Sequence, residues 1–199
     1  MEWMIFGIAS AFTFALVSVF DKLIISNYVP GGRVLVATVG ITQILLGLAT
    51  VPLAIGSQYS LVSVTVVLLS GLFSGTYLIA MFIIMEYHDV ARVVPVVSTY
   101  PVFVAILASI FLGEHISGGA WICILITVSG AALVSLSPSQ QDSGSSDGRW
   151  IAMAFLFLAS LSFGLSQFLA KVVADEMSLW GQYTLRAFGG GIVMLSLAL

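Results

Sequence analysis

The feature that most restricts the fold of this chain is a long stretch without ionisable side chains. From Val34 to Met85 the sequence contains no Asp, Glu, Lys, Arg or His. That length accommodates two membrane-spanning helices of about 20 residues each and a turn. A soluble domain would need charged outer faces, and soluble domains usually carry about 25% charged residues. Here 8% are charged and 60% hydrophobic, which predicts an integral membrane protein.

Turn residues and charges divide the whole chain into apolar segments of spanning length. The predicted fold is therefore all-α, a polytopic membrane bundle of about seven transmembrane helices. One connection differs from the others, because residues 138–149 are rich in Ser, Gln, Asp and Gly and are predicted to form a polar linker. The expected spans are 3–26, 32–55, 61–86, 90–112, 118–137, 150–172 and 178–199.

Lys22 and Lys171 are the only lysines, and each follows a similar short sequence, Thr-Phe-Ala-Leu in the first case and Ser-Phe-Gly-Leu in the second. This similarity predicts a duplicated unit, with a first five-helix copy in 1–137 and the first two helices of a truncated second copy in 150–199. Because five is odd, the copies would enter the membrane from opposite sides and form an inverted repeat. The alternative is two unrelated helices that each carry a lysine near one end.

Small and polar residues follow one face of the third predicted span. Gly71 and Gly75 form a G-x-x-x-G pattern, which favours close helix packing. Ser70 and Ser74 lie beside these glycines, and we expect them to pack as well. Cys123, the one cysteine, lies in an apolar run and is predicted to be buried and inert.

Ionisable residues near or inside spans are candidates for gating or coupling. They are Asp21, Glu86 and Arg186, and the last lies deep enough in the seventh span to require a partner or a cavity. Functional and structural pairing of Arg186 are equally compatible with the sequence.

Enzymatic chemistry has little support in the sequence. Glu86, His88 and Asp89 lie in a short turn, which favours a solvated loop over a metal site. There is no phosphate-binding Gly-Lys-Ser/Thr loop. We therefore expect no metal, no cofactor and no enzymatic activity. The net charge of −3 is too small to predict nucleic acid as a partner.

The fourth and fifth spans carry the most specific pattern. Pro101 precedes the pair Gly113-Glu114, and Gly130 follows. This pattern resembles the EamA-type domain of the drug/metabolite transporter superfamily, whose ten-helix carriers duplicate a five-helix unit. The sequence departs from that family at Cys123, where Gly is frequent, at the additional Pro95, and in length, since three spans of a ten-helix carrier are absent.

The prolines also predict a structural feature independently of the family resemblance. A proline within a span removes a backbone hydrogen bond, so Pro95 and Pro101 are predicted to bend the fourth span, either around a cavity or as a static kink. Glu114 directly follows the apolar residues of this span, and its expected role is to end the span at the interface rather than to act in gating.

The resemblance implies secondary transport of a small organic solute, a metabolite or drug, by alternating access across the plasma or inner membrane of the cell. Spans 1, 3, 4 and 6 should line the path, and proton coupling is a further hypothesis. The expected partners are the solute, the lipid bilayer, and either a second copy of the chain or further C-terminal helices. The residues predicted to contact solute are Thr13, Phe14, Tyr77, Ser98 and Gln167.

Two points stay open at the level of sequence. The count of Lys and Arg on alternating sides predicts an external N-terminus, whereas the resemblance implies a cytoplasmic one. The alternatives to transport are a non-transporting membrane subunit and a membrane-embedded lipid-modifying enzyme, whose only carboxylate and histidine cluster would be the turn that contains Glu86.

Overall fold

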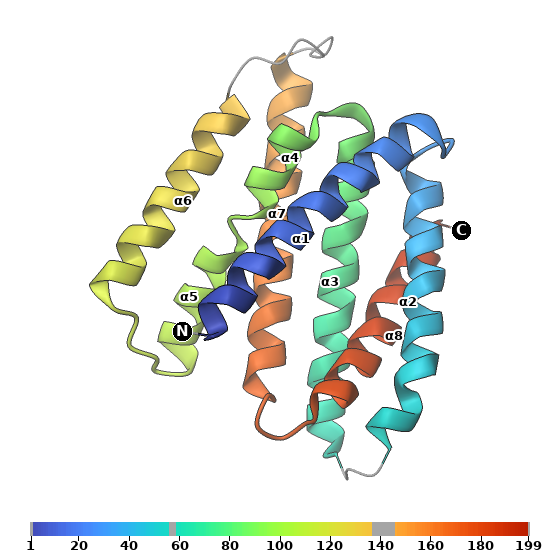
Figure 1. Ribbon diagram of the computed structural model, residues 1–199, viewed down its shortest axis with the longest axis vertical. Helices are drawn as coiled ribbons and strands as arrows, with labels where there is room; N and C mark the ends of the chain where they lie inside the picture. The colour runs from blue at the N-terminus through green and yellow to red at the C-terminus, as the bar shows by residue number, and fades with distance from the viewer. Residues whose placement is uncertain (1, 56–58, 137–145, 199) are drawn as a thin grey trace.

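The described part of the chain is a bundle of eight helices without strands (Figure 1). A computed structural model describes residues 2–55, 59–136 and 146–198. The prediction of an all-α bundle is confirmed. The helices are α1 (Glu2–Asn27), α2 (Gly32–Ala54), α3 (Leu61–Tyr87), α4 (Val90–Val97), α5 (Tyr100–Phe111), α6 (Gly118–Leu136), α7 (Ser146–Val172) and α8 (Leu179–Ala198).

Most predicted spans correspond to observed helices. Five segments are long and apolar enough to cross a membrane, namely α1, α2, α3, α4 with α5, and α7. The sixth, α6, has a shorter apolar stretch, Gly118–Val134. The seventh, α8, carries polar residues and a run of glycines.

Part of the predicted linker is helical. Helix α7 begins at Ser146, before the expected start at residue 150. Acidic residues are enriched in the first turn of a helix, so the polar sequence that predicted a linker also suits a helix start. Residues 137–145, the rest of the predicted linker, lie outside the described residues.

Helix α3 lies at the centre of the bundle and runs antiparallel to α7. Near the start of α3, Ser63 contacts Glu176, just beyond the end of α7, whereas further along α3 the carbonyl of Phe73 accepts a hydrogen bond from Ser162. Helices α1 and α7 also run in opposite directions (Figure 1). Opposite directions of these two helices are what an inverted repeat requires, although the repeat itself stays a prediction.

The two lysines consequently lie at opposite ends of the bundle. The Lys22 ammonium donates hydrogen bonds to the carbonyls of Met85, at 2.6 Å, and His88, at 3.0 Å, at the C-terminal end of α3. Lys171 lies at the C-terminal end of α7, beside the start of α3, and forms a 2.6 Å ion pair with Glu114.

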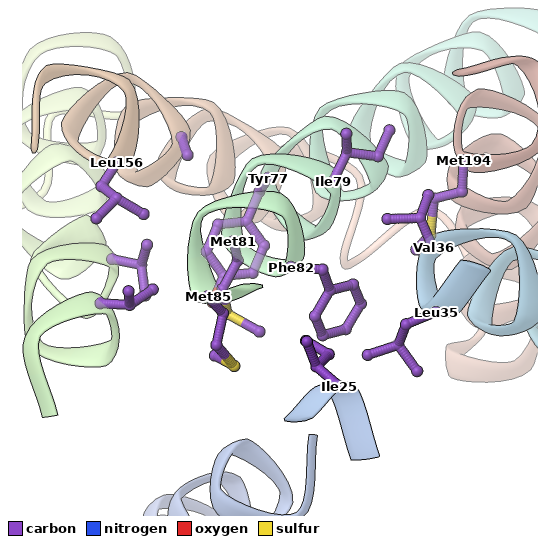
Figure 2. Close-up of a cluster of buried hydrophobic side chains, with 13 residues drawn as sticks. Ile25, Leu35, Val36, Tyr77, Ile79, Met81, Phe82, Met85, Leu156 and Met194 are labelled. Carbon is purple, nitrogen blue, oxygen red and sulfur yellow. The ribbon is translucent and has the colours of Figure 1, made fainter. Parts of the chain in front are cut away.

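The main apolar core surrounds the C-terminal half of α3. Figure 2 shows Tyr77, Met81 and Met85 in its centre, between Leu156 of α7 on one side and Met194 of α8 on the other. Because side chains from six helices meet here, this cluster fixes the positions of α7 and α8 relative to the first helices of the chain.

A seam of glycines joins α8 to α2 and α3. A Cβ added to Gly71 would lie 2.5 Å from the carbonyl oxygen of Arg186, and one added to Gly75 would lie 2.7 Å from that of Gly190. On the other side of α8, a Cβ at Gly40 of α2 would lie 3.0 Å from the Cβ of Met194. The predicted packing role of the G-x-x-x-G pattern is confirmed, and its partner is α8.

The fourth predicted span is interrupted rather than bent. Helix α4 ends at Val97, and α5 begins at Tyr100 with Pro101 in its first turn. Pro101 has no N–H to donate to the carbonyl four residues earlier, so the helix breaks at Ser98 and Thr99. Pro95 lies inside α4 without breaking it.

Cys123 is exposed, and the prediction of a buried thiol is wrong. It lies on α6, most of whose described side chains are exposed or half-buried. Apolar neighbours in the sequence therefore did not indicate burial, because the surroundings of a transmembrane helix are themselves apolar.

Candidate functional site

A cavity of about 350 Å³ opens where α2, α3 and the first turns of α8 meet. Its polar walls are Gln43 of α2, Ser74 of α3 and Gln182, Tyr183 and Arg186 of α8. Leu179 and Ala187 contribute apolar wall. A small pocket with a few polar groups among apolar surroundings is the usual form of a small-solute site.

The depth of this cavity follows from the glycine seam. Gly71 lies near the middle of α3, and its Cα faces the backbone of Arg186 so closely that a Cβ there would lie 2.5 Å from the carbonyl oxygen. Arg186 is therefore at mid-depth of the bundle. An arginine at that depth in a membrane protein faces a cavity or a partner.

The guanidinium of Arg186 has uncharged partners. Its Nη1 and Nη2 donate to Oε1 of Gln167 at 3.4 Å, and Nη2 donates to Oγ of Ser166 at 3.2 Å. These distances are at or beyond the long end of the usual range for N–H···O bonds. Among the residues that the structure describes, no carboxylate pairs with this side chain.

Helix α7 holds these acceptors in place through buried serines. The Ser166 hydroxyl donates to the carbonyl of Ser70 at 2.7 Å, and the Ser70 hydroxyl donates to the carbonyl of Ser166 at 2.8 Å. Both side chains are fully buried. This reciprocal pair fixes α7 against α3, and with it the oxygen atoms that face Arg186.

The residues predicted to contact solute are not brought together. Gln167 alone reaches the Arg186 side chain. Thr13 and Phe14 are exposed on α1, and the Thr13 hydroxyl donates to the carbonyl of Ala9 in its own helix. Ser98 lines a separate cavity of about 150 Å³ that also includes Cys123.

Tyr77 is a packing residue in this structure. It is 2% exposed, its ring stacks on Phe163 at 4.4 Å between centroids, and its hydroxyl donates to the sulfur of Met81. Phe163 in turn makes an edge contact with Tyr100 of α5. The aromatic cluster joins α3, α5 and α7 away from the cavity walls.

The three residues predicted for gating or coupling occupy different places. Glu86 accepts a 2.8 Å hydrogen bond from the backbone N–H of Gly32, and so holds the N-terminus of α2. Asp21 is half-buried on α1 and forms no hydrogen bond or ion pair with the described residues. Only Arg186 lines the 350 Å³ cavity.

The motif residues at the end of the fourth span form a helix stop. Gly113 has φ of +64°, in the left-handed region that favours glycine, and the N–H of Glu114 bonds back to the carbonyl of Ala108 at 3.3 Å. The Glu114 carboxylate then pairs with Lys171. The expected role of Glu114 at a span end agrees with this geometry.

Sequence reasoning missed most of the cavity walls. Gln182 and Tyr183 precede Arg186 by four and three residues, so the three share a helix face, and that spacing was available as a signal. Gln43 had no such signal, because it reaches the cavity only through the packing of α2 on α8. Among the described residues, no group of three or more His, Cys, Asp or Glu side chains could hold a metal ion.

Comparison with known proteins supplies the family. The sequence model of the EamA-like transporter family matches residues 1–136, which include α1 to α6. Searches of curated proteins and of solved structures returned no match. The matched region covers more than half of the chain and contains two walls of the cavity, Gln43 and Ser74. This membrane protein therefore belongs to the EamA-like transporter family.

Proposed function

We propose that the chain is a secondary transporter of the cell membrane that moves a small organic solute by alternating access. The observation that carries this proposal is the cavity at mid-depth between α2, α3 and α8. It combines helices of the matched region with a helix beyond it. Carriers with repeated halves hold their solute near the membrane midplane, between the repeats.

The packing around the cavity suits a relative movement of α8. Between α3 and α8, backbone lies directly against backbone at Gly71 and Gly75, whose closest contacts are the carbonyl oxygens of Arg186 and Gly190. Solute sites of this kind change access when one group of helices rocks against another. The ion pair of Lys171 with Glu114 joins α7 to the end of α5 at one end of the bundle, where a rocking movement would open or close it.

Proton coupling is a second part of the proposal. Asp21 supports it, because this half-buried carboxylate lies near the end of α1 and has no hydrogen-bond or ion-pair partner among the described residues. A pH gradient imposed on proteoliposomes should drive uptake by the native protein, and Asp21→Asn should remove that response. If uptake by the native protein does not depend on the pH gradient, the mechanism is facilitated exchange without proton coupling.

Alternating access is tested by counterflow. Cells that express the chain and control cells should first be given a metabolite mixture, so that accumulated solutes are identified by mass spectrometry. Proteoliposomes loaded with such a solute should then take up labelled solute transiently against its own gradient. Accelerated exchange of this kind requires a site that faces each side in turn, and a purely passive pore would give only equilibration.

A further inference from the structure

The strongest unexplained feature of the bundle is a cation whose charge is not balanced. Arg186 is half-buried at mid-depth, and its described partners are an amide and a hydroxyl. Arginine remains protonated in proteins. A positive charge in a membrane interior is unfavourable without a compensating group. Because no described carboxylate pairs with Arg186, a negatively charged group that enters the cavity could supply this compensation.

The cavity walls limit the charge of that group. Arg186 is the one ionisable cation among the described residues that line the cavity, and Gln43, Ser74, Gln182 and Tyr183 are neutral. A single negative charge on the solute would therefore give a neutral pair. A phosphate dianion would leave a net negative charge in the same place, which low-dielectric surroundings disfavour.

The geometry of the side chain points the same way. A guanidinium presents planar, forked N–H donors that match the two oxygen atoms of a carboxylate. The contacts to Gln167 and Ser166 are 3.2 to 3.4 Å long and involve neutral acceptors, so a charged acceptor would compete well for the same N–H groups.

We propose that the cavity between α2, α3 and α8 binds the carboxylate of a small monoanionic organic solute through Arg186. Gln182, Tyr183 and Gln43 bind the polar remainder of the solute, and Leu179 lies against its apolar part. This inference rests on the proposed transport function, because it names the chemical class of the cargo. The opposing interpretation is that Arg186 only holds α8 to α7.

The direct test is binding to the purified full chain in lipid nanodiscs. The probes are matched pairs that differ only at the carboxylate: benzoate with benzamide, lactate with lactamide, and 4-hydroxyphenylacetate with its amide. At least one carboxylate should raise the thermal midpoint in a saturable manner while its amide does not. Inorganic phosphate is the third arm, and a response to phosphate alone would overturn the assignment to a carboxylate.

Variants separate binding from folding. Arg186→Gln should weaken carboxylate binding by roughly 10- to 100-fold, the usual effect of losing a charge-assisted hydrogen bond. Arg186→Lys keeps the positive charge but lacks the forked pair of N–H donors. Its carboxylate affinity should lie between that of the native protein and that of Arg186→Gln. Arg33→Gln removes an exposed cation outside the cavity and should leave binding unchanged. If Arg186→Gln fails to fold, Gln182→Leu and Arg186→Lys still test the site.

Two results would overturn the inference, and both can be distinguished from failure of the proposed function. The first is equal stabilisation by carboxylates and amides, or binding that Arg186→Lys and Gln182→Leu leave unchanged. The second is transport, with counterflow, of neutral or cationic solutes alone, in which case the protein is a transporter of another cargo. Carboxylate binding without any counterflow would instead support the site and reject transport.

Discussion

At the scale of single residues, Lys22 and Lys171 show how similar sequence positions acquire different energetic roles. Lys22 is half-buried and donates to two backbone carbonyls at the end of α3. Cations near a helix C-terminus are also favoured by the helix dipole. Lys171 is 45% exposed and pairs with an equally exposed Glu114, so solvent screens its interaction.

The two lysines therefore provide a matched pair of variants. Lys22→Met should lower the free energy of unfolding by about 1–3 kcal/mol, because it leaves two partly buried carbonyls without their charged donor. Lys171→Met should lower it by less than about 1 kcal/mol, as is usual for exposed ion pairs. Unfolding in mixed micelles with increasing dodecyl sulfate measures both, and equal losses would contradict the difference in burial.

Gly71 is one of the tightest positions in the seam. Gly71→Ala should destabilise the protein by about 1–3 kcal/mol, since the new methyl group would overlap the Arg186 carbonyl and push α8 away. Gly130→Ala on α6 is the control, because a Cβ there meets nothing within 4 Å. The melting temperature of the control should stay the same or rise, and a loss as large as that at Gly71 would argue against the described seam.

At the scale of elements, helix boundaries were far more predictable from sequence than contacts between helices. Charge-free runs and Gly or Pro turns located α2 and α3 almost to the residue, because apolar length is what a membrane requires of a span. The break at Ser98 was predicted only as a bend, since Pro101 sits where a proline either kinks a helix or starts a new one. Which face of α2 meets α8 has no local signal, and so Gln43 was missed.

The start of α2 illustrates how an element constrains the interpretation of a charged residue. Glu86 was predicted for gating or coupling, yet it holds the first turn of α2 through the N–H of Gly32. Glu86→Ala should therefore reduce stability by about 1 kcal/mol, the usual effect of losing a helix cap. Transport by the Glu86→Gln variant should depend on pH as transport by the native protein does. Loss of proton-driven uptake in that variant would instead indicate that Glu86 takes part in proton coupling.

At the scale of the whole molecule, the opposite directions of α1 and α7 place Lys22 and Lys171 at opposite ends of the bundle (Figure 1). The similarity of the sequences before the two lysines predicted copies that enter the membrane from opposite sides, and it gave no information on the 350 Å³ cavity. The cavity depends on residues of α2, α3 and α8 that come together only after the helices pack.

Labelling from each side of the membrane tests this arrangement. In a background with Cys123→Ser, Tyr28→Cys reports the end of α1 that follows Lys22, and Lys171→Cys reports the end of α7; both positions are exposed. A membrane-impermeant maleimide should reach one of them in intact cells and the other only in inverted vesicles. Reaction of both from the same side is the outcome that the described bundle forbids.

The walls of the cavity divide its chemistry between two stretches of chain. Gln43 and Ser74 come from the part that the family model matches, and Arg186 comes from α8 beyond it. At the glycine seam, α3 lies against the backbone of α8, whereas α2 contacts α8 through side chains as well. Under the proposed function, exchanging Gln182, Tyr183 and Arg186 on α8 should change which solute the cavity binds, while Gln43 and Ser74 keep their places in the cavity wall.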